Sequence, residues 1–311
     1  MPDTNVNVSD RVTLQLPPFW SEQPKKAKQL LKFEELSDRQ QASFCDIFEA
    51  WKRKAFGFTI SPTSESIRCA GTYILYSIPN ESEIKFVRDS VHFNKMAPKL
   101  YYNEVSPPVR SVLLTAKAIG LELDLEQINL FAGEHLKPEY LKINPQHTVP
   151  TLDDDGYYLW DSHAINKYIC EKYGQNDSLY PKDLHKRGTV DQRLFFNAGI
   201  IQPRVGAIVG PIIRQGATSI PKENADNLAA AYDFLETFLE GHEYIAGDSL
   251  TIADMSIIAS LSGIVHFVPV AQNKHPKLSK WMNKMQQLPY YVEANQVGTD
   301  KLVGFLQSKL A

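Results

Sequence analysis

The sequence predicts a mixed α/β domain at residues 96–178, followed by an all-helical domain at residues 185–311. Two observations lead to this fold class. From Lys99 onward, the segments read in order as strand, helix, strand, helix, strand, strand and helix. Beyond Gly174, apolar residues recur only with the helical period. The stretch between the two domains is polar and contains a proline, as is typical of a linker.

Residues 1–95 form a leader that lacks this organisation. In one segment, apolar residues share a single helical face up to a glycine that would end the helix. These residues are Phe44, Ile47, Phe48, Trp51 and Ala55, and the glycine is Gly57. From residue 61 to residue 95, apolar, charged and polar residues mix without a sustained period. We expect the leader to be largely disordered, with that one helix.

The first domain opens at residues 100–110 with a short strand that runs straight into a helix. Pro107 suits the first helical position, where its missing N–H is no loss, so Ser106 is the candidate N-cap. Free backbone N–H groups and the helix dipole would favour an anion there, such as a thiolate, by roughly 0.3–1 kcal/mol. On this segment alone, an ordinary Ser cap that only starts the helix is an equal alternative. The helix should end near Ile119, before Gly120.

A second strand at residues 121–130 and a short helix that begins at Pro138 come next. Residues 144–160 then read as a strand, a turn and an aromatic returning strand, which together form a hairpin. The segment 161–169 opens another helix, with an acid and a hydroxyl at its start. This provides a second helix N-terminus that suits an anion.

The second domain should contain four helices, at residues 185 to about 214, 222–239, 251 to about 267, and 276–287. The first of these should be bent, because proline and glycine interrupt it. The interrupting residues are Pro203, Gly206, Gly210 and Pro211. Thr251 and Asp254 have the spacing of a capping box, so we interpret Asp254 as a structural cap rather than as a catalytic acid.

The composition limits the classes of partner that we expect this protein to bind. The 33 Lys and Arg against 36 Asp and Glu give a formal net charge of −3, so we expect no polyanion-binding face and no nucleic acid partner. Three cysteines have neither an even count nor metal-ligand spacing, so we expect no disulfide, no metal and reduced thiols. The longest apolar stretch, 257–271, is too short to span a bilayer, and a secretory signal is absent. We therefore expect a cytoplasmic protein without a membrane partner.

These segments together resemble the cytosolic glutathione transferases and, within them, the insect delta and epsilon classes, with the epsilon class closer. The resemblance covers residues 96–311. It rests on motifs in one order: Ser106–Arg110, Leu130–Leu136, Asn144–Leu152, Trp160–Ile165, Leu179–Asp183, Ala246–Asp254 and Gln287–Tyr291. It implies a thioredoxin-like first domain and a cytoplasmic homodimer. The implied activity is conjugation of reduced glutathione to small hydrophobic electrophiles in xenobiotic detoxification, with peroxide reduction by glutathione as a side activity.

The resemblance implies a catalytic role for Ser106, whose hydroxyl would donate a hydrogen bond to the glutathione sulfur. A thiol with a cysteine-like pKa of about 8.5 is mostly protonated at neutral pH and is then a poor nucleophile. Lowering this pKa by about two units needs near 2.7 kcal/mol, which one hydrogen bond and a helix N-terminus can supply. Related proteins that exchange disulfides carry Cys at this position, so serine favours reactions of glutathione itself.

The resemblance also assigns the glutathione contacts: His135, His147, Thr148, Val149, Pro150, Asp161 and Ser162. A cis bond between Val149 and Pro150 would turn the Val149 backbone outward to pair with glutathione like an added strand. Asp161 would face the γ-glutamyl ammonium group and Ser162 the γ-glutamyl carboxylate. The two histidines would face the glycyl carboxylate, although lone histidines also fit a purely structural role.

The implied electrophile pocket lies against the first helix of the second domain. Its expected lining is Val105, Phe131, Phe196, Ile200, Arg204 and Ile208. A plain surface charge is the alternative interpretation of Arg204. The alternative function for the whole chain is a non-catalytic binder of hydrophobic ligands or a scaffold. The intact set of Ser106, Val149, Asp161 and Ser162 argues against it, because a scaffold does not need all four.

Overall fold

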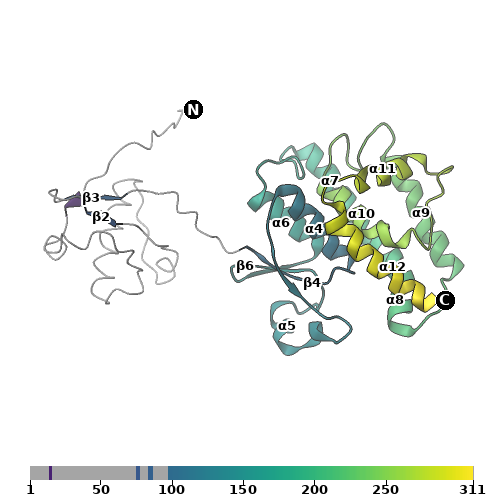
Figure 1. Cartoon of the computed structure of the whole chain (residues 1–311). Helices are drawn as coiled ribbons and strands as arrows, with labels where there is room; N and C mark the ends of the chain where they lie inside the picture. The colour runs from purple at the N-terminus through teal and green to yellow at the C-terminus, as the bar shows by residue number, and fades with distance from the viewer. Residues whose placement is uncertain (1–13, 16–74, 78–82, 87–96, 311) are drawn as a thin grey trace. The chain divides into compact units, whose positions relative to one another are not determined.

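A computed structural model of the chain describes residues 97–310 and three short strands in the leader. The chain divides into two compact units, Met1–Lys95 and Met96–Ala311 (Figure 1). The described strands of the first unit pair antiparallel in the order β1, β3, β2. These strands are β1 (Leu14–Gln15), β2 (Leu75–Ser77) and β3 (Glu83–Phe86). The predicted helix near Trp51 and the expected disorder lie outside the described residues.

The second unit begins with a four-stranded mixed sheet in the order β5, β4, β6, β7. Its strands are β4 (Lys99–Tyr102), β5 (Asp124–Gln127), β6 (Thr151–Asp154) and β7 (Tyr157–Trp160). β4 pairs parallel with β5 and antiparallel with β6, and β6 forms the predicted hairpin with β7. β5 is shorter than the strand predicted at residues 121–130, and all four of its residues are exposed at the edge of the sheet.

One face of this sheet is covered by α4 (Pro107–Ile119) and α6 (Ser162–Tyr173). Leu100 and Leu152 on the strands pack in one core with Val112 and Ile165 on the helices, and all four are fully buried. The predicted bounds of α4 are confirmed. The helix ends at Ile119 because the next residue, Gly120, adopts the left-handed conformation, which glycine tolerates best.

The other face of the sheet carries the short helix α5 (Pro138–Ile143), which starts at the predicted proline. Side chains alternate between the two faces of a strand, so Tyr101 points away from its neighbour Leu100. The Tyr101 ring meets the Tyr140 ring of α5 edge-on, with 5.8 Å between the ring centroids. The arrangement of two helices on one face and one on the other is visible in Figure 1.

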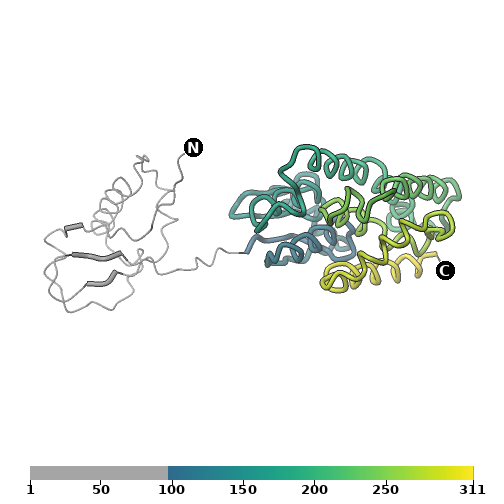
Figure 2. The backbone as a smooth tube through the Cα atoms, turned by 90° about the horizontal axis from the view of Figure 1, so that it is seen from above, coloured from purple at the N-terminus to yellow at the C-terminus, as the bar shows by residue number. Residues whose placement is uncertain are grey.

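The rest of the second unit is helical (Figure 2). Its helices are α7 (Leu184–Phe196), α8 (Gln202–Gln215), α9 (Lys222–Phe238), α10 (Ile252–Ile264), α11 (Pro276–Gln286) and α12 (Val297–Leu310). All four predicted helices are present, the first of them as α7 and α8 together. α12 was not located from the sequence.

The predicted irregularity of the first long helix is confirmed. α7 continues into α8 through a π-helical turn at Asn197–Ile201, just before Pro203. Inside α8, Pro211 has no N–H to donate to the carbonyl of Ala207 one turn earlier. The Asn224 side chain of α9 donates to this carbonyl instead, at 3.0 Å. The neighbouring helix thus satisfies the acceptor that the proline leaves open.

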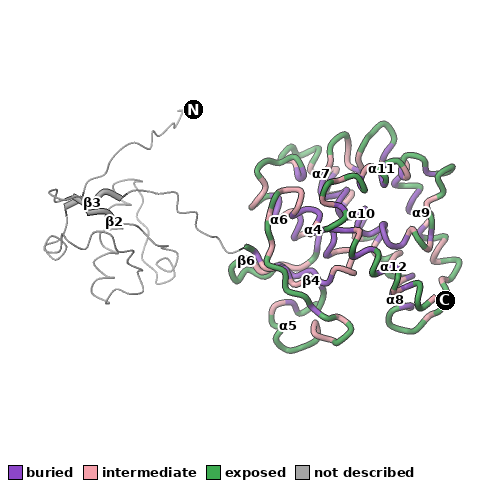
Figure 3. Tube along the Cα trace, viewed as in Figure 1, coloured by how far each residue is buried: buried purple, intermediate pink, exposed green. Residues whose placement is uncertain are grey.

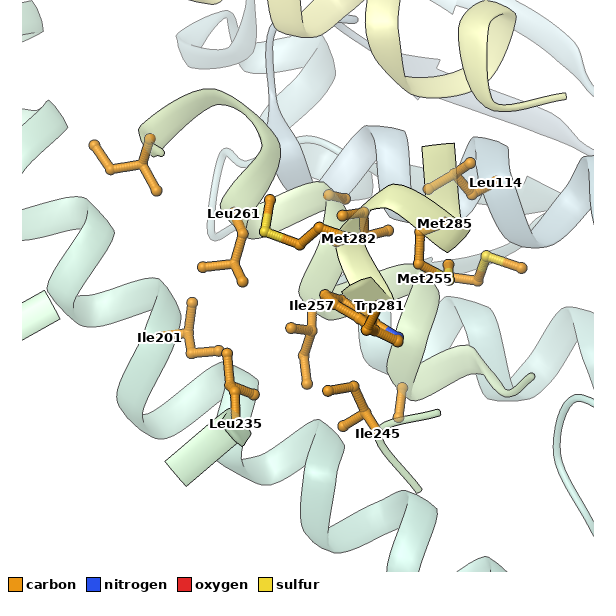
Figure 4. Close-up of a cluster of buried hydrophobic side chains, with 14 of the residues drawn as sticks. Leu114, Ile201, Leu235, Ile245, Met255, Ile257, Leu261, Trp281, Met282 and Met285 are labelled. Atoms are coloured by element: carbon orange, nitrogen blue, oxygen red, sulfur yellow. The ribbon is translucent and has the colours of Figure 1, made fainter. Parts of the chain in front are cut away.

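α10 is the centre of the helical domain, and each of its residues is buried. Figure 3 shows buried residues along α4 and α10, with exposed residues around the outside. In Figure 4, Leu114 of α4 and Met255 of α10 lie in the same cluster as Trp281. The predicted capping box starts α10, and the Asp254 carboxylate also accepts a hydrogen bond from the Trp281 indole N–H at 2.9 Å.

No described helix is both long and apolar enough to cross a membrane.

Candidate active site

Strand register gathers the predicted site at one end of the sheet. β4, β5 and β7 run in one direction and β6 in the other, so the C-terminal ends of the first three lie beside the start of β6. Tyr101, Thr151 and Trp160 are opposite one another across three neighbouring strands. The loops that carry Ser106 and the predicted glutathione contacts therefore all leave the sheet at this end.

Ser106 is the N-cap of α4, but its hydroxyl makes no capping hydrogen bond and no other bond within the described part of the chain. The turn before it is shaped by Asn103, a buried residue that the sequence did not single out. Asn103 donates from its side chain to Ile128 O at 2.9 Å and accepts from Ser106 N at its backbone carbonyl at 3.0 Å. Ser106 thus presents a free hydroxyl at a helix N-terminus.

The Val149–Pro150 peptide bond is cis, as predicted. The backbone N–H and C=O of Val149 have no hydrogen-bond partner among residues 97–310. The loop is fixed from behind, because the Tyr140 hydroxyl and the Asn144 amide both donate to Thr148 O, at 2.6 and 3.0 Å. Val149 therefore has an unpaired backbone within a loop that is held in place at Thr148.

Asp161 caps α6 and has a positive φ of 71°. One carboxylate oxygen, Oδ1, accepts from the backbone N–H groups of His163 and Ala164 and from His163 Nδ1. The hydrogen bond from His163 lowers the pKa of Asp161. The second oxygen, Oδ2, accepts nothing from the described residues. Ser162, only 3% exposed, follows at the first helical position with its hydroxyl also free of described partners.

His163 links this helix start to the second domain. The Asn197 side-chain N–H group lies 3.1 Å from His163 Nε2. An amide nitrogen can only donate, so His163 Nε2 accepts this hydrogen bond. His163 Nδ1 therefore carries the ring proton and donates to Asp161 Oδ1. This link could not be predicted from the sequence, because Asn197 lies in the π-helical turn, 34 positions beyond His163 in the chain.

His135 and His147 lie together, with 6.1 Å between their ring centroids. His135 follows β5 in a short 3-10 helix, Glu134–Leu136, and His147 is exposed on the loop before the cis bond. Burial lowers the pKa of His135, and the neighbouring His147 lowers it further. His135 Nδ1 is buried and has no hydrogen-bond partner among the described residues. The pair places two imidazoles side by side.

The six residues of the predicted pocket are only partly brought together. Phe131 is 66% exposed, and its ring meets the ring of Phe305 of α12 at a tilt, with centroids 5.2 Å apart. Val105 is half-buried and packs on the core of the second domain. Phe305 is a pocket candidate that the sequence missed, because α12 itself was not located.

The other four predicted pocket residues lie along α7, the π-helical turn and α8. Phe196 packs edge-on against Phe238 of α9, with centroids 5.1 Å apart. Arg204 donates to Asn227 O of α9 at 2.6 Å. Ile208 is fully within the second-domain core, while Ile200 is half-buried. Phe196 and Arg204 therefore contact α9, whereas Phe131 contacts α12.

Two family models match the chain. The N-terminal domain of glutathione S-transferases matches residues 100–177, and the C-terminal domain matches residues 197–289. Glutathione S-transferase 1 of Manduca sexta is 41% identical over 218 residues, which are 70% of this chain and 100% of that protein. The chain belongs to the glutathione S-transferase family.

Solved structures of other glutathione S-transferases agree with this assignment. An epsilon-class enzyme from the housefly, Musca domestica, is 51% identical with a TM-score of 0.67, and the match covers 68% of this chain and 98% of that chain. A delta-class enzyme from Nilaparvata lugens is 40% identical with a TM-score of 0.65, covering 68% and 99%. A homolog from Drosophila mojavensis, solved with bound glutathione, is 46% identical with a TM-score of 0.64, covering 68% and 97%.

The family assignment confirms the predicted architecture of a thioredoxin-like domain followed by a helical domain. Both family models begin beyond residue 99, so the leader of this glutathione S-transferase lies outside them. Within the described residues, no group of three or more His, Cys, Asp or Glu side chains could hold a metal ion.

Proposed function

We propose that this glutathione S-transferase conjugates reduced glutathione to small hydrophobic electrophiles, with Ser106 as hydrogen-bond donor to the thiolate. The observation that carries the proposal is the free Ser106 hydroxyl at the N-terminus of α4. A hydroxyl and a helix N-terminus both favour an anion over a neutral thiol. The sulfur of bound glutathione then attacks the electrophile, and no enzyme cysteine takes part. Burial raises the pKa of the Cys170 thiol to about 12, so this residue is a poor nucleophile.

The proposed glutathione contacts follow the loops around Ser106. The unpaired Val149 backbone would add the cysteinyl backbone of glutathione as a short strand, with Thr148 and Pro150 on either side. Asp161 Oδ2 would accept from the γ-glutamyl ammonium group. Ser162, at the N-terminus of α6, would donate to the γ-glutamyl carboxylate. His135 and His147 would together bind the glycyl carboxylate.

The electrophile is proposed to bind where the two domains meet beside Ser106. Support comes from Val105, which precedes Ser106, and from the contacting rings of Phe131 and Phe305. Partly exposed aromatic rings provide apolar surface for a small hydrophobic molecule. Ile200 would extend this wall from the π-helical turn, and reduction of organic peroxides by glutathione would use the same arrangement.

We also propose that the protein is a homodimer. Large apolar side chains are exposed on β7 and at both ends of α7, and a second copy of the chain would cover them. They are Tyr157, Tyr158, Leu184 and Phe195. A cytoplasmic location and a role in xenobiotic detoxification remain predictions.

A conjugation assay with a chloronitrobenzene tests the proposed reaction. We expect measurable turnover with glutathione, and a fall of about tenfold or more in Ser106→Ala, because the hydrogen-bond donor that favours the thiolate over the thiol is removed. Ser219→Ala is the matched control, since Ser219 is an exposed loop residue, and it should keep the wild-type rate. Turnover in Ser106→Ala equal to that of the wild type would remove Ser106 from the mechanism.

A further inference from the structure

Gly298 brings the backbone of α12 into direct contact with the loop before Ser106. A Cβ atom at this position would lie 2.0 Å from Glu104 O and 2.9 Å from Arg110 Cδ. Real Cβ atoms do not approach a carbonyl oxygen so closely, because van der Waals repulsion is steep at that distance. The glycine is buried in the first turn of the helix. Any side chain at residue 298 must therefore displace the loop or the helix.

Arg110 ties the same loop to the C-terminal segment. Its side chain is 1% exposed. It donates to Val105 O at 2.9 Å, to Asn295 Oδ1 at 2.9 Å and to Ala259 O at 3.0 Å. The Val105 carbonyl belongs to the peptide bond that enters Ser106. Burial lowers the pKa of Arg110 to about 10, so the side chain stays charged at neutral pH and its hydrogen bonds are charge-assisted.

Lys301, one turn beyond Gly298, pairs with the Glu104 carboxylate at 2.5 Å. This hydrogen bond lowers the pKa of Glu104, which is therefore ionised at neutral pH. Gln127 is a weaker partner of the other carboxylate oxygen, at 3.5 Å. An unneutralised carboxylate two residues from Ser106 would oppose a thiolate there. The lysine offsets that charge.

We propose that Asn295, Gly298 and Lys301, the C-terminal clamp, position the Ser106 hydroxyl for the glutathione thiolate. The inference rests on the proposed function and adds positioning residues to it. The clamp acts on the two residues before Ser106: Gly298 and Lys301 on Glu104, and Asn295 on Val105 through Arg110. A hydrogen bond to sulfur depends steeply on the placement of its donor, so a shift of this loop weakens the bond without touching the other glutathione contacts.

Gly298→Ala tests the clamp, with two glycines as matched controls. A Cβ at Gly304, on the same helix, would meet nothing within 4 Å. A Cβ at Gly263 would crowd the Leu302 side chain of α12 at 3.2 Å and would meet no atom of the Ser106 loop within 4 Å. In Gly298→Ala, we expect kcat to fall about tenfold, because small misplacements at a reacting centre are costly. The KM for glutathione should change little, and Gly304→Ala and Gly263→Ala should keep the wild-type kcat.

Ultraviolet difference titration of bound glutathione provides a second readout. The pKa of its thiol should be higher in Gly298→Ala than in the wild type and unchanged in both controls. In a Ser106→Ala background, Gly298→Ala should cause no further loss of kcat, because the hydroxyl that it displaces is already absent. An equal loss in both backgrounds, or a wild-type titration in Gly298→Ala, would show that the clamp only packs the helix.

Lys301→Met covers the case in which Gly298→Ala does not fold, because the Lys301 side chain is half exposed. The thiol pKa should rise, the rise should shrink in high salt, and Glu104→Gln in the same protein should reverse it. A thiol pKa in Lys301→Met equal to that of the wild type would overturn the clamp. If the wild-type protein does not lower the pKa of the glutathione thiol, both the proposed function and the clamp are refuted. If the wild type lowers this pKa and the variants lower it equally, only the clamp is refuted.

Discussion

At the scale of single residues, the two carboxylate oxygens of Asp161 have different surroundings. Oδ1 accepts three hydrogen bonds from the start of α6, and Oδ2 accepts none from the described residues. The shortest of these bonds, from His163 N, is 2.8 Å. The capping role holds the side chain in place, so its free oxygen is also fixed in position.

Asp161→Asn should separate these two roles. Asparagine is as good an N-cap as aspartate, so the fold should be kept, whereas the charge that would attract an ammonium group is lost. We expect the KM for glutathione to rise about tenfold, equivalent to about 1.4 kcal/mol, with a much smaller effect on kcat. Steady-state kinetics would measure both.

Two comparisons make this measurement decisive. Asp155→Asn, in the exposed turn between β6 and β7, is the control for loss of one negative charge and should leave the KM unchanged. Glutathione acetylated on its amino group should bind equally poorly to the wild type and to Asp161→Asn. If Asp161→Asn still discriminates between the two peptides as the wild type does, Asp161 does not contact the ammonium group.

At the scale of elements, local signals in the sequence predicted most helix starts. Pro107, Pro138 and Pro276 each begin a helix as expected, and Thr251 caps α10. α12 escaped prediction because Gly298 and Gly304 have low intrinsic helix propensity, so this helix depends on its tertiary contacts. Local sequence carries little information about such contacts.

The predicted pocket wall on the first long helix shows a second limit of sequence reasoning. The π-helical turn at 197–201 adds a residue to one turn. One extra residue rotates everything after it by about 100° around the helix axis. Arg204 is thereby directed to α9 and Ile208 to the core. The prolines predicted an irregular helix, but not the direction in which its side chains would turn.

Thr251→Ala tests the capping box of α10. The change removes the acceptor for Ala253 N and a donor to Asp254, so the free energy of unfolding should fall by about 1 kcal/mol. Chemical denaturation would measure it, and refolding should be slower while activity per folded molecule stays the same. Thr237→Ala, on the exposed face of α9, should change stability by less than about 0.5 kcal/mol. Lost activity in fully folded Thr251→Ala would contradict a purely structural cap.

At the scale of the whole molecule, both family models lie within the compact unit Met96–Ala311. The sequence motifs of the site and the sheet that orders them lie in that unit. The Manduca sexta relative is matched over its full length by 70% of this chain. The remainder of the chain is thus additional to a complete transferase unit.

Deletion of residues 1–95 should therefore leave turnover and melting temperature nearly unchanged. The loops of the proposed site and the buried cores belong to the retained unit. Light scattering should give a mass of two chains for the truncated and the full-length protein. A large loss of turnover or of thermal stability would show that the leader packs on the transferase unit, and a monomeric mass would contradict the proposed homodimer.

The pairing of Glu104 with Lys301 joins residues that are 197 positions apart in the sequence. During synthesis, the thioredoxin-like domain leaves the ribosome long before its partner lysine has been added. A nascent chain can therefore form its sheet early, but the segment that borders Ser106 stays without Lys301 until 197 further residues have been added. Completion of this corner of the molecule has to wait for α12.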